Sequence, residues 1–174
     1  SKYTVRVVIV CSVDLVGIWN NFIKLKVSLG LLLNGVADNK IIYEMGREIG
    51  RQCKRMGIHV NFAPVIDVDR FRSSVIGDRS FSENPDTVSL AAGAFINGIH
   101  DAGLPCVGKH FPGHGSVVED SHLEHPVDYR SLEEITSHDL VPFQKLIPSL
   151  DAIMPAHMTF PKIDKNPVTY SSFW

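Results

Sequence analysis

Residues 84–111, NPDTVSLAAGAFINGIHDAGLPCVGKHF, decide the fold class because they predict a helix that leads directly into a strand. Asn84-Pro85-Asp86 is typical of a helix start, and Gly103 follows where this helix should end. Residues 105–111 then predict a strand, so the stretch supplies one helix–strand unit of an α/β fold. Helical spacing predicts one inward face, formed by Val88, Ala91, Ala92, Phe95, Ile96 and Ile99.

The same alternation continues toward the N-terminus. Residues 43–56 predict a helix that ends before Gly57. Residues 59–68 contain the sequence NFAPVIDV and predict a buried strand that runs into a loop. The inward face predicted for the helix consists of Met45, Ile49, Cys53 and Met56.

Toward the C-terminus, Ser131 and Glu134 form a capping-box pattern, which predicts the start of a helix that runs on to Ile147. Residues 151–158 predict a further short strand, and the remaining residues predict loops. Strands and helices that alternate over modest connections predict βαβ units around a parallel sheet.

Three such units follow residue 40, whereas residues 1–40 fit the pattern poorly apart from a candidate strand at residues 5–10. Three or four units cannot close an eight-stranded barrel, and an open sheet would expose a reactive edge. The alternatives are a smaller α/β fold or part of a larger barrel, and we favour the second. We therefore expect a poorly matching segment at residues 1–40 and a partial barrel domain at residues 41–174.

Composition narrows the class of protein. The 174 residues are 44% hydrophobic, which is enough for one good core, and the apolar run at residues 29–33 is too short to span a bilayer. The net charge of −2 gives no electrostatic reason to expect a nucleic acid or membrane partner. Three cysteines without paired spacing favour a reducing compartment over a disulfide framework.

Polar side chains gather where the predicted strands end. Asp67 and Asp69 follow the first strand, Lys109 and His110 close the second, and His157 closes the third. Ligands bind at the carboxyl edge of parallel strands because the loops converge there. A single histidine at a strand end is more often structural, but recurrence at successive strand ends favours a site.

The loop after the second strand carries the densest set of polar residues. Gly113 and Gly115 permit close backbone approaches in this loop. Asp120 lies two residues before His122, so its carboxylate can orient one imidazole nitrogen and leave the other for proton transfer near neutral pH. A solvated loop with an incidental Asp-x-His spacing is the alternative, and spacing alone does not decide between them.

These residues resemble the signature of the family-3 β-N-acetylglucosaminidases, which are glycoside hydrolases of bacterial peptidoglycan recycling. The similarity covers residues 41–174, and several motifs in one order make it more specific than a single pattern. The motifs are NFAPVIDV at 61–68, IGDRSF at 76–81, KHFPGHG at 109–115, DSHLE at 120–124, MPAHM at 154–158 and TYSSFW at 169–174.

The resemblance implies a TIM-type (β/α) barrel, of which this chain covers a part, and hydrolysis of terminal β-linked N-acetylglucosamine with retention of configuration. The implied substrate is a GlcNAc–1,6-anhydro-MurNAc muropeptide, or its peptide-free form, in the cytoplasm. We expect no cofactor or metal, and a monomer if the chain is complete.

The resemblance also implies residue roles. His122 matches the general acid/base, and Asp120 matches the partner that orients it. Arg79, Lys109 and His110 match residues that bind the non-reducing sugar. Weaker candidates, more typical of structural residues near the site, are His114, Asp67 and His157.

Two segments that the resemblance leads us to expect are absent from the sequence. An SDDLSM-like segment with the nucleophilic aspartate should follow TYSSFW, and a DQEGGRVQR-like segment with a sugar-binding aspartate should precede Tyr43. The chain therefore resembles a fragment, a truncated reading frame or a decayed copy, and we expect it to be inert, or nearly so, on its own. Turnover of a chromogenic N-acetylglucosaminide would contradict this.

Three alternatives stay open. A zinc site could use the histidines of the loop, but Pro112 and the glycines oppose the helix that would align them. A sugar-binding module would bind N-acetylglucosamine without turnover. Another family-3 glycosidase, such as a β-glucosidase, usually lacks the histidine–aspartate pair. The histidines of the zinc alternative are His110, His114, His122 and His125.

Overall fold

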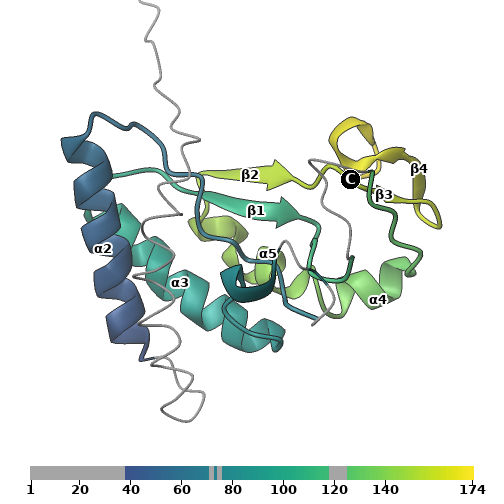
Figure 1. Ribbon diagram of the computed structural model, residues 1–174, viewed down its shortest axis with the longest axis horizontal. Helices are drawn as coiled ribbons and strands as arrows, with labels where there is room; N and C mark the ends of the chain where they lie inside the picture. The colour runs from purple at the N-terminus through teal and green to yellow at the C-terminus, as the bar shows by residue number, and fades with distance from the viewer. Residues whose placement is uncertain (1–37, 71–72, 74–75, 118–124) are drawn as a thin grey trace, which may run out of the picture.

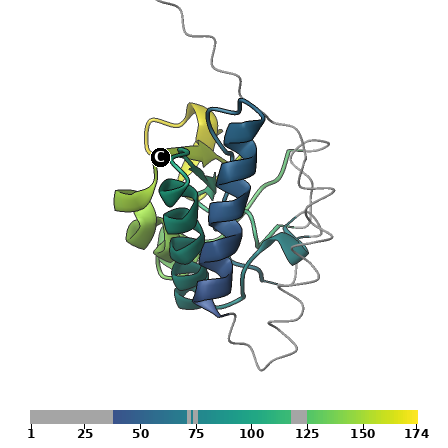
Figure 2. The same ribbon diagram turned by 90° about the vertical axis from the view of Figure 1, so that its left-hand side faces the viewer.

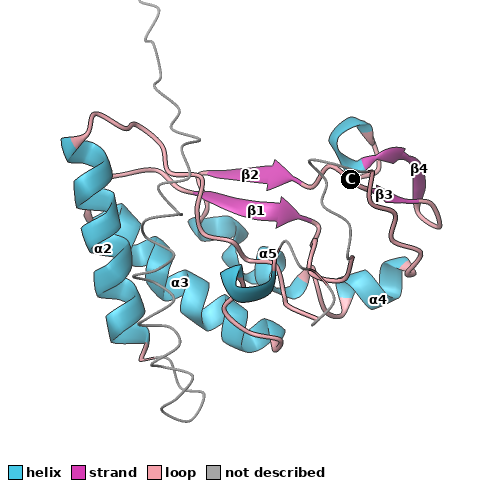
Figure 3. Cartoon of the chain, in the orientation of Figure 1, coloured by secondary structure: helices cyan, strands magenta, loops and turns pink. Residues whose placement is uncertain are grey.

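The computed structural model describes residues 38–70, 73, 76–117 and 125–174 of the chain. Two parallel strands, β1 (Val107–Phe111) and β2 (Ala152–Pro155), lie side by side (Figure 1). The chain between them forms α4 (Leu132–Thr136) and α5 (Val141–Leu146), so that the two strands and their connection make a β–α–β unit (Figure 3). The predicted parallel arrangement is confirmed.

The main core lies between these strands and the helices α2 (Asn39–Arg55), α3 (Pro85–Asp101) and α5. All six residues predicted to face inward from α3 are buried. Asn84 caps α3 by accepting hydrogen bonds from the backbone N–H groups of Asp86 and Thr87, and Pro85 occupies the first turn. The prediction for this helix is therefore confirmed.

Helices α2 and α3 lie side by side (Figure 2). Glycines on both helices allow this close approach. A Cβ atom at Gly46 would collide with the carbonyl oxygen of Phe95, and one at Gly98 would collide with that of Tyr43. The buried face of α2 is consequently Ile42, Gly46 and Gly50. The predicted face was wrong for Met56, which is 53% exposed. The glycines of α2, and not its large apolar residues, form the contact with α3.

The strand predicted at residues 59–68 is an extended segment that makes only isolated parallel bridges. Asn61 pairs with Cys106, just before β1, and Val65 pairs with Lys109 in β1. Its backbone still bonds to β1, with Ile66 N donating to the carbonyl of Lys109 over 2.8 Å. Pro64 has no N–H to contribute, which interrupts a regular ladder. The segment nevertheless delivers Asp67 to the carboxyl end of β1.

The helix predicted from Ser131 to Ile147 is two helices, α4 and α5, followed by the 3₁₀ turn η2 (Ile147–Ser149). The capping box is confirmed, because Ser131 and Glu134 each accept from the other's backbone N–H. Pro142 cannot donate to a carbonyl one turn earlier and its ring would clash there, so one continuous helix is excluded.

The C-terminal residues, predicted as loops, form a small antiparallel pair, β3 (Thr159–Phe160) and β4 (Asp164–Pro167), and the 3₁₀ turn η3 (Val168–Tyr170). They enclose a second core, and Trp174 packs against it. The buried residues of this second core are Val117, Ile135, Ala156, Met158, Phe160 and Val168.

Within the described part of the chain, no helix is both long enough and apolar enough to cross a membrane. The candidate strand at residues 5–10 lies outside the described residues, and the division at residue 40 stays a prediction.

Candidate functional site

A buried carboxylate organises the carboxyl end of β1. Asp67 is fully buried and lies beside His110, the fourth residue of the strand. Because a carboxylate only accepts, the ring Nδ1–H of His110 donates to Oδ2 of Asp67, over 2.7 Å. The backbone N–H of His110 donates to the same carboxylate over 3.1 Å, and that of His114 donates over 2.7 Å. One aspartate therefore fixes both an imidazole and the loop that follows it.

The hydrogen bonds to Asp67 also set its charge. Burial by itself would raise the pKa of this carboxyl, but the hydrogen bonds and charge interaction with His110, together with the backbone N–H of His114, hold the pKa below its ordinary value. Asp67 is therefore ionised at neutral pH, and the site contains a fixed negative charge at the Nδ1 edge of the His110 ring.

The loop after β1 folds back over the segment that carries Asp67. A Cβ atom at Gly115 would collide with the carbonyl oxygen of Val68, so this close approach requires glycine. Gly113 has a φ of +141° and lies against Asp139. The rings of His110 and His114 meet edge to face, with centroids 6.0 Å apart.

Arg79 is brought toward the same end of the strands by its neighbour. It ends the 3₁₀ turn η1 (Gly77–Arg79). The next residue, Ser80, donates its hydroxyl to the carbonyl of Asp67 over 2.7 Å and accepts from the backbone N–H of Asp69 over 3.2 Å. These hydrogen bonds connect the segment with Arg79 to Asp67, the residue that holds His110. Lys109 directly precedes His110 in β1.

A buried ion-pair network, not recognised in the sequence, lies behind this loop. Arg130 donates to Asp128 over 2.7 Å, to Asp139 over 2.6 Å and to the hydroxyl of Ser116 over 2.6 Å. Burial alone would raise the pKa of Asp128, but Arg130 outweighs it and holds that pKa below the ordinary value. The network fixes Ser116 and Asp128, which lie on either side of residues 118–124.

The remaining predicted residues fall into two groups. Asp120 and His122 lie outside the described residues, so their roles stay predictions. His157 is exposed, and its Nδ1 lies 3.1 Å from the hydroxyl of Thr169 and its ring against Tyr170. His157 therefore contacts the C-terminal turn η3, and its hydrogen bond and ring contact among the described residues are separate from the pair formed by Asp67 and His110.

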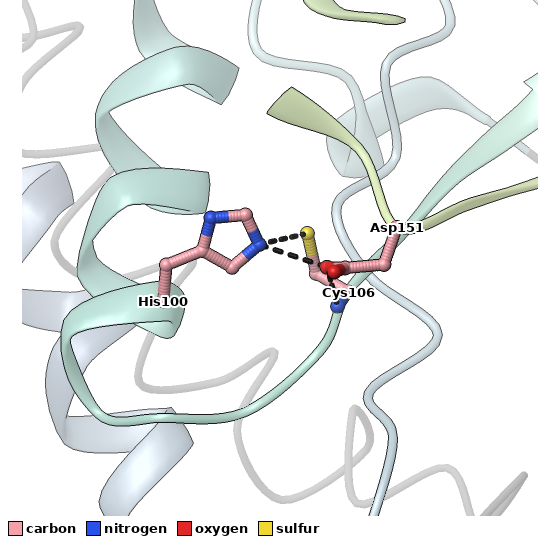
Figure 4. A group of neighbouring side chains, drawn as sticks. All are labelled: His100, Cys106 and Asp151. Carbon is pink, nitrogen blue, oxygen red and sulfur yellow. Dashed lines mark hydrogen bonds and ion pairs between the residues drawn. The ribbon is translucent and has the colours of Figure 1, made fainter. Parts of the chain in front are cut away.

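Only one group of three metal-ligating side chains has its donor atoms within 4.8 Å of one another in the described part of the chain, and it does not include the loop histidines. It consists of His100, Cys106 and Asp151, shown in Figure 4. These residues lie at the end of α3 and just before β1 and β2, which is the amino end of the strands. No sequence motif joins them.

Comparison with known proteins agrees with this architecture. Residues 26–174 match the family described as "Glycosyl hydrolase family 3 N terminal domain". A β-hexosaminidase of Idiomarina loihiensis is 52% identical over 131 residues, which are 75% of this chain and 39% of that protein.

Two solved structures of NagZ from Neisseria gonorrhoeae are also similar. The complex with N-trifluoroacetyl-D-glucosamine has a TM-score of 0.80 at 38% identity and covers 86% of this chain and 44% of its own. The complex with a zinc ion has a TM-score of 0.75 at 36% identity and covers 82% of this chain and 42% of its own.

The chain thus spans between 39% and 44% of the length of these relatives. The family domain is of the TIM-barrel type, so the predicted fold class is confirmed, with this chain carrying part of that barrel. By its match over residues 26–174, the chain belongs to the family of the glycosyl hydrolase family 3 N-terminal domain.

Proposed function

We propose that this chain supplies the sugar-binding end of a β-N-acetylglucosaminidase, which removes terminal β-linked N-acetylglucosamine from peptidoglycan fragments. The family match and the β-hexosaminidase of I. loihiensis support the reaction class. The NagZ complex with N-trifluoroacetyl-D-glucosamine supports an N-acylated glucosamine as the sugar. The proposed substrate is GlcNAc–1,6-anhydro-MurNAc, with or without peptide, in the cytoplasm.

The observation that carries this proposal is the imidazole of His110, held by the buried carboxylate of Asp67. With Nδ1–H committed to Asp67, a neutral ring has its lone pair on Nε2 and can accept a hydrogen bond from a sugar hydroxyl. The cationic groups of Lys109 and Arg79 can only donate, so the three side chains together suit hydroxyls, which do both. We assign the non-reducing sugar to these three residues.

The proposed general acid/base is His122, oriented by Asp120. Retaining hydrolysis needs a group that protonates the departing glycosidic oxygen and later activates water. A histidine with an ordinary pKa of about 6.5 can do this near neutral pH without the burial that a carboxyl group would need. The network of Arg130, Ser116 and Asp128 supports the proposal, because it anchors the chain on both sides of this loop.

Calorimetric titration of the purified chain with N-acetylglucosamine tests the binding assignment. We expect His110→Ala to weaken binding at least about tenfold, which corresponds to about 1.4 kcal/mol. His59→Ala is the matched control, since His59 is exposed. Equal affinity in wild type and His110→Ala, or no binding at all, would contradict the proposal.

Hydrolysis of two substrates tests the role of His122. The test uses a longer protein that carries this chain together with the nucleophilic aspartate of the expected SDDLSM-like segment, because the chain alone is expected to be inert. A sugar leaving group needs a proton more than a nitrophenolate does, so His122→Ala should slow the natural disaccharide by about 10²–10⁴-fold and the nitrophenyl glycoside less. Equal loss on both substrates would contradict an acid role. Binding without turnover of either substrate by that longer protein would favour the sugar-binding module instead.

A zinc-dependent hydrolase is the second candidate, because a related NagZ has been crystallised in complex with a zinc ion. The two candidates differ in their response to chelation. Hydrolysis that uses His122 and a carboxylate should persist in a strong chelator, whereas loss of turnover that returns on adding zinc would favour the metal-dependent reaction.

A further inference from the structure

A second polar cluster lies at the amino end of the strands, and the proposed sugar site does not use it (Figure 4). The Nε2 atom of His100 is 2.8 Å from Oδ2 of Asp151 and 3.5 Å from Sγ of Cys106. The three side chains come from the last turn of α3 and from the residues just before β1 and β2. Three segments that are distant in sequence therefore converge on one point.

The donor atoms are an imidazole nitrogen, a sulfur and a carboxylate oxygen, each of which is a common ligand of Zn²⁺. Softer ions prefer sulfur-rich sites and harder ions prefer oxygen-only sites, so the mixed set favours a borderline divalent ion. We propose that His100, Cys106 and Asp151 form a zinc site at the amino end of the strands. This inference does not rest on the proposed glycosidase function.

The spacing of the donors fits a tetrahedral ion with little movement. Ordinary zinc bond lengths at tetrahedral angles place nitrogen and sulfur about 3.6 Å apart, and nitrogen and oxygen about 3.3 Å apart. The observed nitrogen–sulfur separation of 3.5 Å already matches. The nitrogen–oxygen separation of 2.8 Å must widen by roughly 0.5 Å, which a partly exposed side chain can accommodate. Asp151 is 44% exposed and His100 is 36% exposed.

The surroundings of the cluster also suit a bound ion. The backbone N–H of Cys106 donates to Oδ2 of Asp151 over 2.8 Å, and hydrogen bonds of this kind orient ligating carboxylates. Cys106 is fully buried, whereas the other two ligands reach solvent, so water can enter and complete four-fold coordination.

Binding exchanges one proton for the ion. In the metal-free protein, burial and then the negative charge of Asp151 raise the pKa of the Cys106 thiol to about 12, so the thiol is protonated. Zinc binding breaks the S–H bond and forms a Zn–S bond, and the proton leaves to solvent. The ring proton of His100, which Nε2 donates to Asp151 in the metal-free protein, moves to Nδ1, so that the Nε2 lone pair binds the ion. No oxidant or reductant is required.

The position of the site indicates a structural role. His110 lies four residues after Cys106 along the strand, which is roughly 13 Å at the usual rise per residue. An ion at Cys106 is therefore too far from His110 to touch the same sugar. It would instead join the end of α3 to the starts of β1 and β2, and so stabilise the folded chain.

Cobalt binding, with zinc competition, tests this site in the 174-residue chain. One equivalent of Co²⁺ should produce a near-ultraviolet thiolate-to-metal absorption band that zinc abolishes. The band should be lost in Cys106→Ser and kept in Cys53→Ser, a matched control on α2. Because Cys106 is buried, His100→Gln provides a variant that leaves the core intact, and it should weaken zinc binding at least tenfold.

Thermal unfolding supplies the second readout. Zinc at about 100 times its Kd should raise the Tm of the wild-type chain by about 5–10 °C, and that of His100→Gln by much less. A cobalt band that persists in Cys106→Ser, or no band at one equivalent in the wild type, would overturn the proposal. Zinc binding lost in His110→Ala but kept in His100→Gln would also overturn it, by moving the ion to the opposite end of the strands.

Discussion

The two ends of the parallel strands carry similar residue types in different physical settings. At the carboxyl end, the carboxylate of Asp67 is fully buried and receives hydrogen bonds from His110 and from the backbone of His114. At the amino end, the carboxylate of Asp151 is 44% exposed and shares one oxygen between His100 and the backbone of Cys106. The first arrangement is rigid and suits a ligand with fixed hydroxyls, whereas the second can adjust to a small ion.

The largest expected difference between the two ends is in the free energy of unfolding that is lost when Asp67 or Asp151 is replaced. Asp67→Ala leaves two backbone N–H groups and an imidazole without their buried acceptor, and should lower the free energy of unfolding by about 3–5 kcal/mol. Asp151→Ala, at a partly exposed position, should lower it by about 1 kcal/mol or less. Urea unfolding of both variants measures the difference, and similar losses would contradict the contrast.

Replacing Arg130 tests whether the carboxyl end depends on its ion-pair network. Lysine keeps the charge but cannot bond Asp128, Asp139 and Ser116 at once, so Arg130→Lys should lower the free energy of unfolding by about 1–3 kcal/mol. Arg47→Lys is the matched control, since its partner Glu44 is exposed. If urea unfolding shows that Arg130→Lys lowers the free energy of unfolding no more than the control does, the network does not stabilise this end of the strands.

Acid titration sharpens the contrast through Asp67. Its pKa is lowered in the folded chain, so the unfolded chain binds more protons and the stabilisation is fully present above the unfolded pKa of about 3.9. That stabilisation is lost as the pH falls through the folded pKa. The advantage of wild type over Asp67→Asn should therefore shrink below about pH 4. Urea midpoints from pH 7 to pH 3 measure it, and a constant difference would show that charge plays no part.

A small effect, similar to that of Asp151→Ala, is expected at Ser80, which ties the segment with Arg79 to Asp67. Ser80→Ala should lower the free energy of unfolding by about 1 kcal/mol and weaken N-acetylglucosamine binding, while zinc binding at the amino end stays unchanged. Ser82→Ala is the control, because its hydroxyl only accepts from the backbone of Asn84. Calorimetry with both ligands would show whether the two ends are independent.

The sequence was most informative where local chemistry decides the structure. The Asn84 cap, Pro85 and the inward face of α3 are local signals, and all are confirmed. The inner face of α2 was not predictable in the same way, because Gly46 is buried only where α3 approaches it. The break between α4 and α5 had a signal in Pro142, which the capping box at Ser131 obscured.

In the candidate site, too, local features were predictable from the sequence and long-range contacts were not. Placing Lys109 and His110 at the end of a strand required only the apolar pattern of β1, and the structure agrees. The part played by Asp67 was underestimated, because its hydrogen-bond donors lie 43 and 47 residues away in the sequence. The cluster around Cys106 has no motif at all, since His100 and Asp151 are 51 residues apart.

The central claim is that an amino sugar binds at the carboxyl end of the strands and not at the amino end. A titration of the isotope-labelled chain with N-acetylglucosamine, followed by amide ¹H–¹⁵N spectra, tests it residue by residue. We predict shifts at Arg79, Lys109 and His110, with Cys106 and Asp151 unchanged. Shifts confined to Cys106 and Asp151, or none at millimolar sugar, would contradict the account.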